Sequence, residues 1–150
     1  MTAKPLNIIL TDDDADDQLF FQDALTEINA PVSFKTLSNG DELMNHLLQE
    51  ETVLPDILFL DHNMPLKTGM QCLEEIRNHK KLENLFVIIY STSFSDEEVD
   101  NFYHKKANLF INKPNGFTEL KKVLTKALTL DIPKYTSTGS RHNFVLSFEN

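Results

Sequence analysis

Acidic residues follow two short apolar segments of the sequence. Asp12 and Asp13 come directly after Leu6–Thr11, and Asp61 comes directly after Ile57–Leu60. Carboxylates brought within several ångströms of one another repel, and a proton or a cation has to relieve that repulsion. Carboxylate oxygens and a backbone carbonyl are ligands for a hard divalent ion such as Mg²⁺, which keeps water and phosphate in its other positions. These acids therefore predict a divalent-metal site if the fold brings them together.

Two further apolar segments end in a hydroxyl and an ammonium group. Ser91 and Thr92 lie at the end of Phe86–Ser91, and Lys113 comes shortly after Asn108–Ile111. A metal ion on one side and an ammonium group on the other suit the oxygens of a transferring phosphoryl group. A carboxylate held between them can act as the nucleophile and form an acyl phosphate.

The elements that must position these residues alternate along the chain. Five short runs rich in β-branched or aromatic residues lack polar alternation, which indicates strands buried on both faces. Helical spacing of apolar residues fills the stretches between them and after the last one, so we expect an α/β fold with helices on both faces of a parallel sheet. The expected strands are Leu6–Thr11, Val32–Leu37, Ile57–Leu60, Phe86–Ser91 and Asn108–Ile111.

Polar residues indicate where the helices begin. Asp14 is expected to cap the first helix and Ser38 the second, because Asp and Ser are favoured N-cap residues. Ser95 and Glu98 have the spacing of a capping box before the fourth. The fifth is expected from about Phe117 to Leu130.

In order and spacing, the chain from about Leu6 to Leu130 resembles a response-regulator receiver domain of two-component signalling. The resemblance implies a flavodoxin-like fold: a doubly wound, five-stranded parallel sheet in the order 2-1-3-4-5, with five helices. It also implies a stand-alone receiver domain over residues 1–130, with a C-terminal extension over 131–150 and no output domain.

The resemblance assigns roles to the polar residues by position. Asp61 matches the phosphoacceptor, and Asp12 and Asp13 match the acidic pair that holds Mg²⁺ together with Asp61. Asn63 matches the position whose main-chain carbonyl completes the metal site. Lys113, before a proline, matches the family's lysine at the phosphoryl group.

Three more positions match the part of the family that responds to phosphorylation. Ser91 matches the hydroxyl that turns toward the phosphate, and Phe110 matches the aromatic residue whose rotamer changes with it. Thr92 stands where a small Ala is common, which bears on access to the phosphate. Phe110 also departs from the pattern, because it lacks the hydroxyl of the Tyr found in many members.

Composition excludes several classes of protein. The chain has 14 Lys and Arg against 23 Asp and Glu, a formal net charge of −9, which argues against a nucleic-acid-binding protein. Its single cysteine, Cys72, excludes an intramolecular disulfide and a Cys-rich zinc site, and is expected to be a buried small hydrophobe. The apolar runs are too short to cross a membrane. We therefore expect a cytoplasmic protein.

Two further expectations concern the acidic residues. Mg²⁺ is the expected cofactor, because these carboxylates predict a divalent-metal site. His62, beside Asp61, is expected to face solvent.

The expected function is that of a signalling module. Asp61 would accept a phosphoryl group from a histidine kinase or a histidine phosphotransfer protein, and a protein-protein interaction surface would then switch. Beyond slow self-catalysed phosphorylation and dephosphorylation, no enzymatic activity is expected.

Two other functional classes compete with this one. A haloacid-dehalogenase-like phosphatase also uses an aspartyl-phosphate intermediate, but it typically has a second Asp two residues after the nucleophile, where this chain has Asn63. A flavodoxin-type or nucleotide-binding module would need an anion-attracting loop after the first strand, whereas Asp12, Asp13 and Asp14 repel phosphate in the absence of a metal.

The segment after residue 130 has open alternatives. Phe144–Phe148 has the composition of one more short strand. It could extend the sheet at an edge, pack over a helix, or reach across to another subunit of a homodimer. Because an exposed apolar terminus is an aggregation hazard, we expect it to be docked.

Overall fold

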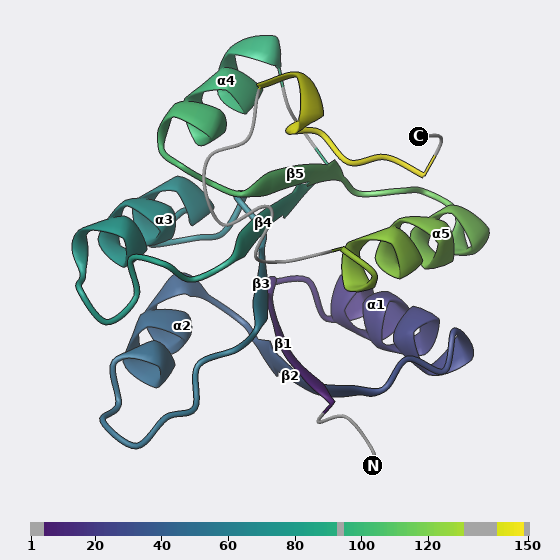
Figure 1. Cartoon of the computed structure of the whole chain (residues 1–150), viewed down its shortest axis with the longest axis horizontal. Coiled ribbons are helices and arrows are strands. Elements are labelled where there is room, and N and C mark those ends of the chain that lie inside the picture. The colour runs from purple at the N-terminus through teal and green to yellow at the C-terminus, as the bar shows by residue number, and fades with distance from the viewer. Residues whose placement is uncertain (1–4, 93–94, 131–140, 149–150) are drawn as a thin grey trace.

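The five expected strands form one parallel sheet. The computed structural model describes residues 5–92, 95–130 and 141–148 (Figure 1). The strands pair in the order β2-β1-β3-β4-β5, which confirms the predicted flavodoxin-like topology. Their bounds match the prediction for the first three strands and differ by one residue in the last two: β1 (Leu6–Thr11), β2 (Val32–Leu37), β3 (Ile57–Leu60), β4 (Val87–Ser91) and β5 (Leu109–Asn112).

Helices cover both faces of the sheet. Helices α1 and α5 lie on one face, and α2, α3 and α4 lie on the other (Figure 1). A short 3-10 turn, η1 (Arg141–Asn143), follows later in the chain. The helices are α1 (Ala15–Glu27), α2 (Gly40–Leu47), α3 (Gly69–Asn78), α4 (Asp96–His104) and α5 (Phe117–Leu128).

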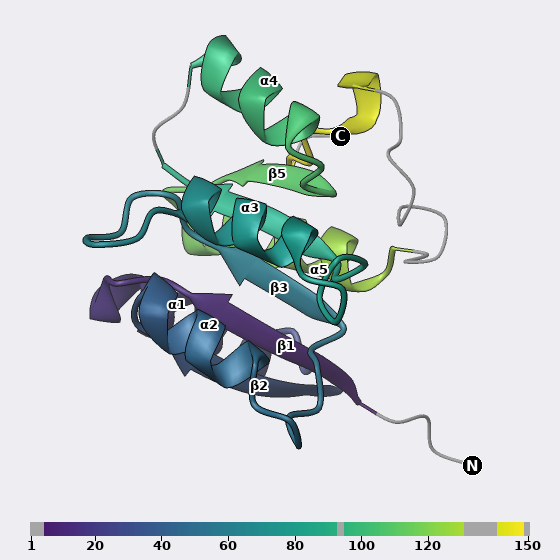
Figure 2. The ribbon, with the colours of Figure 1, turned by 90° about the vertical axis from the view of Figure 1, so that its left-hand side faces the viewer.

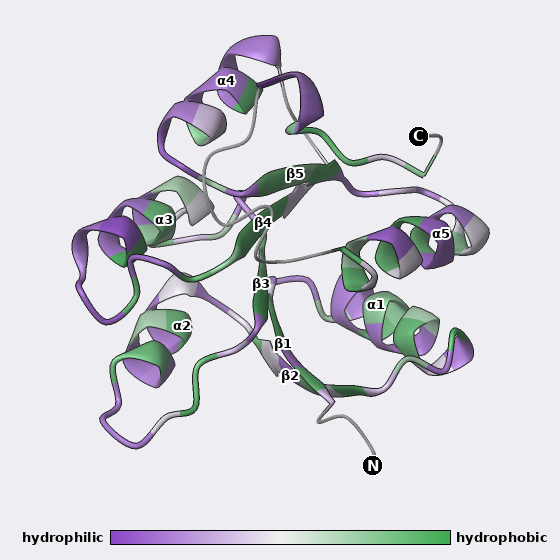
Figure 3. Ribbon diagram, in the orientation of Figure 1, coloured by the Kyte–Doolittle hydropathy of each residue, from purple (hydrophilic) through white to green (hydrophobic). Residues whose placement is uncertain are grey.

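The central strands are apolar on both faces because two separate cores need them, whereas buried and exposed positions alternate along the edge strand β2, which was not predicted from the sequence. Ile57 and Phe59 of β3 pack into the core beneath α1 and α5, whereas Leu58 and Leu60 pack into the core beneath α2, α3 and α4. Figure 3 shows the central strands as hydrophobic and the outer helix surfaces as largely hydrophilic. Cys72 is fully buried in the second core, as predicted, and burial raises the pKa of its thiol to about 11.

Two of the three predicted helix caps form. The Asp14 carboxylate accepts hydrogen bonds from two backbone N–H groups at the start of α1, and the Ser95 hydroxyl accepts one at the start of α4. The cap of α2 was predicted one residue too early: Asn39 fills that position, not Ser38. The Asn39 side chain accepts from the backbone N–H of Glu42 at 2.8 Å, and Asn is as favourable an N-cap as Ser.

The C-terminal segment lies beside β5. Phe144–Phe148 forms less of a strand than its composition indicates: Val145 makes an isolated parallel bridge with Phe110, and among the described residues of this segment no other bridge forms. In the parts of the chain that the structure describes, no helix is both long and apolar enough to span a bilayer.

The loop between β3 and α3 depends on a close backbone approach at Gly69. A Cβ atom at this position would contact the Asp61 carbonyl oxygen and lie 2.8 Å from the Cα of His62, and neither backbone atom can move aside cheaply. At Gly116, the same addition would meet only the flexible side chain of Glu119.

We therefore predict that Gly69→Ala lowers the free energy of unfolding by about 1–3 kcal/mol, the usual cost of overpacking. Gly116→Ala is the matched control and should cost less, because the Glu119 side chain can rotate away. Urea denaturation of both variants measures the difference, and equal losses would contradict the close approach at Gly69.

Candidate functional site

The site lies at the carboxyl ends of four neighbouring strands. The strands run side by side in one direction, so their ends meet at one rim of the sheet (Figure 2). The ladder continues one residue beyond the strands: the Asp61 N–H donates to the Thr11 carbonyl at 3.0 Å, and the Lys113 N–H donates to the Ser91 carbonyl at 2.9 Å. Backbone hydrogen bonds thus hold the site residues in register.

Three of the predicted carboxylates gather at this rim. Asp12 is fully buried, Asp61 is 4% exposed and Asp13 is exposed. One oxygen from each lies within 4.8 Å of the oxygens of the other two. The donor set is therefore three carboxylates of the kind that a hard divalent ion prefers. The carbonyl of Asn63, the fourth expected ligand, stays a prediction.

Lys113 is the cation of the site. Its Nζ donates to Asp12 Oδ2 at 2.7 Å and to Asp17 Oδ2 at 2.9 Å, and it lies 3.6 Å from Asp61 Oδ2. The ammonium group also lies 5.4 Å from the centre of the buried Tyr90 ring. This ammonium group is therefore shared among the carboxylates that directly follow β1 and β3 and one in the first turn of α1.

Sequence reasoning missed Asp17 as a member of this site. Acids in the first turn of a helix are favoured by its dipole, so Asp17 looked like part of an ordinary helix start. The available signal was its place in the first turn of α1, directly after the acidic residues at the end of β1.

Burial sets the protonation of the carboxylates. Loss of solvent raises the pKa of Asp61 to about 6, and the charge of Asp12 adds to the rise. The charge of Lys113 and backbone hydrogen bonds from Asn63 and His62 act in the opposite direction. Burial likewise raises the pKa of Asp12 above its ordinary value, despite its bond to Lys113. The site thus holds more negative charge than Lys113 alone neutralises.

The pKa of Lys113 shifts in the direction of a fixed cation. Burial alone would lower it, but the hydrogen bonds to Asp12 and Asp17 and the charge of Asp61 raise it above its ordinary value. Lys113 therefore stays protonated across the physiological range.

Ser91 presents a buried hydroxyl at the end of β4. Its Oγ has no hydrogen-bond partner among the described residues, and the side chain is fully buried. Thr92 follows it and is exposed. The side-chain amide of Asn112, oriented with its nitrogen toward the end of β4, donates to the carbonyl oxygens of Ser91 and Thr92 at 3.1 and 3.2 Å. The backbone that carries both hydroxyls is therefore fixed to β5.

Two aromatic rings, one of them beside Asp61 in the sequence, pack against Phe102 of α4. Phe110 is fully buried in the core beneath α4, where its ring centre lies 5.9 Å from that of Phe102. His62 was expected to face solvent, and this was wrong: the residue is half-buried, its Nδ1 accepts from the Met70 N–H at 3.3 Å, and its ring packs edge-on against Phe102. The tight turn that positions Gly69 also turns the imidazole inward.

Because the pKa of Asp61 is raised, replacing this carboxylate by a neutral residue should stabilise the protein, and the gain should depend on pH. The folded carboxyl binds its proton more tightly than the unfolded one, so the folded state loses stability as the pH rises from about 4 through 6. In buffer that contains a metal chelator, Asp61→Asn should raise the free energy of unfolding at pH 7 by about 3 kcal/mol, and the gain should shrink toward pH 4. Urea denaturation at the two pH values measures both effects.

Asp23→Asn, an exposed acid of α1 outside the site, is the control and should change stability little at either pH. A destabilised Asp61→Asn, or a gain that is the same at both pH values, would show that burial does not strain this carboxylate.

Comparisons with known proteins agree with this geometry. The family model of the response regulator receiver domain matches residues 8–125. The response regulator Rcp1 of Synechocystis is 27% identical over 80% of this chain and 84% of its own. The probable C4-dicarboxylate response regulator DctR of Bacillus subtilis is 31% identical over 84% of this chain, which spans 54% of that relative's length.

Solved structures show the same fold. The phosphorylated cyanobacterial phytochrome response regulator RcpA superposes with a TM-score of 0.76 at 27% identity, over 91% of this chain and 97% of the other. The Mn²⁺-bound form of Rcp1 also gives 0.76, at 25% identity over 83% and 96% of the two chains.

Receiver domains are signalling modules rather than classical enzymes, they bind Mg²⁺ through an acidic pocket, and they interact with histidine kinases or phosphotransfer proteins. With the match over residues 8–125, the strand order and the acidic rim together, the chain belongs to the response regulator receiver domain family.

Proposed function

We propose that this chain is a phosphoacceptor of a two-component phosphorelay and that Asp61 is the residue phosphorylated. The observation that carries the proposal is the position of Asp61: buried, 3.6 Å from the Lys113 ammonium group, and in one cluster with Asp12 and Asp13. The phosphorylated state named for RcpA supports phosphorylation of this chain, and the Mn²⁺-bound state named for Rcp1 supports a divalent ion in it. No observation favours the phosphatase alternative, and Asn63 stands where such an enzyme would have its general acid.

The donor set fits a divalent ion. Asp12, Asp13 and Asp61 would hold Mg²⁺, with the main-chain carbonyl of Asn63 as a fourth protein ligand. Bound there, the ion would neutralise the carboxylate excess and the charge of the incoming phosphoryl oxygens. Its binding would also favour the ionised form of Asp61, whose pKa burial raises to about 6.

The reaction requires an ionised Asp61. One carboxylate oxygen attacks the phosphorus of a phosphohistidine, the oxygen–phosphorus bond forms, and the phosphorus–nitrogen bond breaks with its electron pair left on the imidazole. Lys113 already lies beside the attacking carboxylate and would donate a hydrogen bond to a phosphoryl oxygen. Asp17 holds the ammonium group from its other side.

The hydroxyl groups and Phe110 would respond to the product. The buried Ser91 Oγ, which has no partner among the described residues, gains one when it donates to a phosphoryl oxygen. Thr92, exposed and directly after Ser91, would limit access to the phosphoryl group. We propose that Ser91 and Phe110 then turn toward the phosphoryl group and that the surface formed by α4, β5 and α5 changes between two states.

The proposed partner is a histidine kinase or a histidine phosphotransfer protein, and the downstream target is a protein. We assign residues 1–130 to the receiver domain and 131–150 to an extension of it, and we place the chain in the cytoplasm. Its net charge of −9 makes a nucleic acid an unfavourable partner.

The decisive experiment is a mass measurement. Incubation with acetyl phosphate and MgCl₂ should add the mass of one phosphoryl group to the wild-type chain, and the addition should disappear in a chelator. Asp61→Asn should show no addition, because the nucleophile is gone, whereas Asp56→Asn, an acid at the opposite end of β3, should behave as wild type. An equal gain on Asp61→Asn would overturn the assignment.

Metal binding can be tested separately. MgCl₂ should raise the midpoint of thermal unfolding of the wild-type chain, since a ligand that binds the folded state stabilises it. Asp13→Asn removes an exposed ligand without disturbing the buried Lys113 contacts, so it should weaken Mg²⁺ binding by about tenfold or more. Asp23→Asn should titrate as the wild-type chain does, and an identical Mg²⁺ response in Asp13→Asn would remove this residue from the metal site.

A further inference from the structure

The edge of β5 carries a segment from the C-terminal part of the chain. An edge strand presents unpaired N–H and carbonyl groups that another extended segment can bind. Here the Phe110 N–H donates to the Phe144 carbonyl at 3.0 Å, and the Leu146 N–H donates to the Phe110 carbonyl at 2.9 Å. Figure 1 shows this segment, in yellow, alongside β5 between α4 and α5. We call residues 141–148 the tail segment.

Side chains of the tail segment reach both neighbouring helices. Phe144 is 2% exposed, and its ring centre lies 5.4 Å from that of Tyr103 on α4. Arg141 pairs with Asp100 of α4 at 2.7 Å. On the other side, Lys126 of α5 donates to the Ser147 carbonyl at 2.8 Å.

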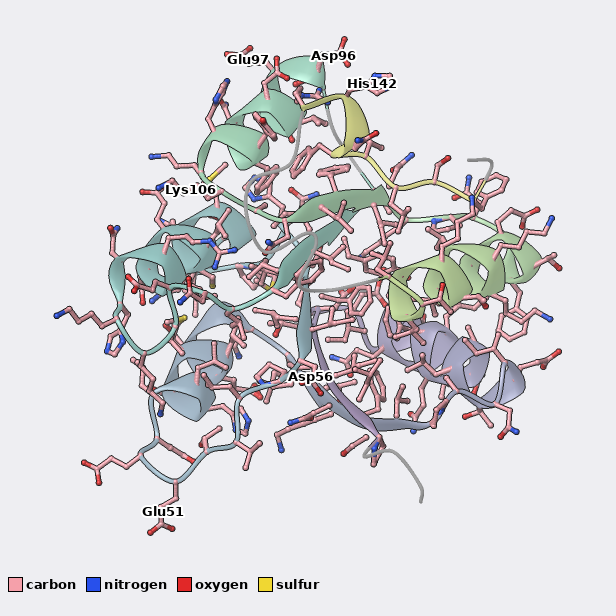
Figure 4. All side chains as sticks on the ribbon, in the orientation of Figure 1. Glu51, Asp56, Asp96, Glu97, Lys106 and His142 are labelled. Atoms are coloured by element: carbon pink, nitrogen blue, oxygen red, sulfur yellow. The ribbon has the colours of Figure 1, made fainter. Side chains whose placement is uncertain are left out.

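The polar part of the tail segment faces outward. Figure 4 shows His142 of η1 on the outer side of the molecule, toward α4 and away from the core. The tail segment therefore covers the edge between α4 and α5 with its apolar side turned inward.

A row of aromatic rings joins the tail segment to the phosphoacceptor. His62, the residue after Asp61, packs against Phe102 with ring centres 5.1 Å apart. Phe102 packs against Phe110 at 5.9 Å, and Phe110 packs against Phe144 at 6.5 Å. Phe110 therefore contacts the tail segment through its ring and through both of its backbone hydrogen bonds.

We propose that the edge of β5 is a docking surface for an extended segment with an aromatic anchor, that the tail segment of the same chain occupies it, and that phosphorylation of Asp61 releases that segment. The release exposes the edge of β5 to a partner strand of similar character. This inference rests on the proposed function, because it needs a phosphoryl group on Asp61.

The position of Phe110 explains why phosphorylation would weaken docking of the tail segment rather than strengthen it. Its ring lies against Phe144 and Phe102, so a turn of Phe110 toward Ser91 and the phosphoryl group withdraws it from Phe144. Phe144 then loses one wall of its buried position, and docking weakens. Binding linkage is reciprocal, so loosening the tail segment must strengthen binding of a phosphoryl group or its mimic by the same factor.

Beryllium fluoride with MgCl₂ is the probe, since it mimics a phosphoryl group on an aspartate and activates a related receiver domain. In hydrogen–deuterium exchange, the amides of Leu146 and Phe110 should exchange at least about fivefold faster in the wild-type chain when the probe is bound. Phe144→Ala should bind the probe at least about fivefold more tightly than wild type. Leu146→Pro removes one of the two ladder donors and should act in the same direction.

Phe34→Ala is the matched control. Phe34 of β2 is a partly buried ring, less buried than Phe144, and it packs against Phe21 at the opposite edge of the sheet from the tail segment. It should bind the probe as wild type does, so a general loss of stability is separated from release of the tail segment.

The outcomes separate this inference from the function on which it rests. If wild type fails to bind the probe and Asp61 takes no phosphoryl group, both fail. If wild type binds the probe, but Phe144→Ala and Leu146→Pro bind it no more tightly than wild type does, only the release of the tail segment is overturned. The same holds if bound probe leaves hydrogen exchange at the Leu146 amide unchanged or slows it. Protection of Leu146 that rises with protein concentration would assign the docked segment to a second copy and overturn the intramolecular occupant.

Discussion

The structure depends on an excess of buried negative charge at one rim of an otherwise apolar sheet. Asp12 and Asp61 are almost completely removed from water, and Lys113 is the ammonium group that contacts them. Asp17 binds the same ammonium group, so at least three carboxylates share one cation. Burying charge without full compensation is costly, and here it raises the pKa of Asp61 to about 6. That cost is also what makes the rim receptive to a divalent ion.

The sheet makes this arrangement possible because backbone pairing, rather than the charged side chains, fixes the positions. The register places Thr11 opposite Leu60 and Ser91 opposite Asn112. Asp12 and Asp61 are each the next residue after a paired, buried position, and Lys113 is the next residue after the paired Asn112. Repelling carboxylates cannot move apart without breaking hydrogen bonds between central strands that two cores hold in place.

The sequence predicts most of this framework because the central strands are buried on both faces. Continuous apolar runs bounded by polar residues gave the bounds of β1, β2 and β3, and their order followed from the family resemblance. The last two strands were placed one residue early at their starts. Phe86 is buried without being in β4, and Asn108 uses its side chain to accept from the Val87 N–H at 2.8 Å instead of extending β5. Such a side-chain contact leaves no signal in hydropathy.

The features that the sequence did not predict depend on long-range contacts. Asp17 joins the site only because Lys113, distant in sequence, reaches it, and a first-turn acid has an ordinary local explanation. His62 turns inward because the loop closes on Gly69 and because Phe102 of α4 supplies a surface. In the same way, the composition of Phe144–Phe148 indicates a strand, but its extent depends on how much of β5 is free to pair.

The two edges of the sheet show why one of them needs cover and the other does not. Along β2, buried and exposed positions alternate, and Ser33 and Lys35 present polar side chains to solvent, which protects an edge against unwanted pairing. Along β5, Leu109, Phe110 and Ile111 are all buried, so this edge has no such protection of its own. The same strand leads directly into Lys113 at the site. A strand that combines an apolar edge with the cation of the site is the place where a change at Asp61 can alter what the edge binds. β2 has neither property, because polar residues guard it and β1 separates it from β3 and Asp61.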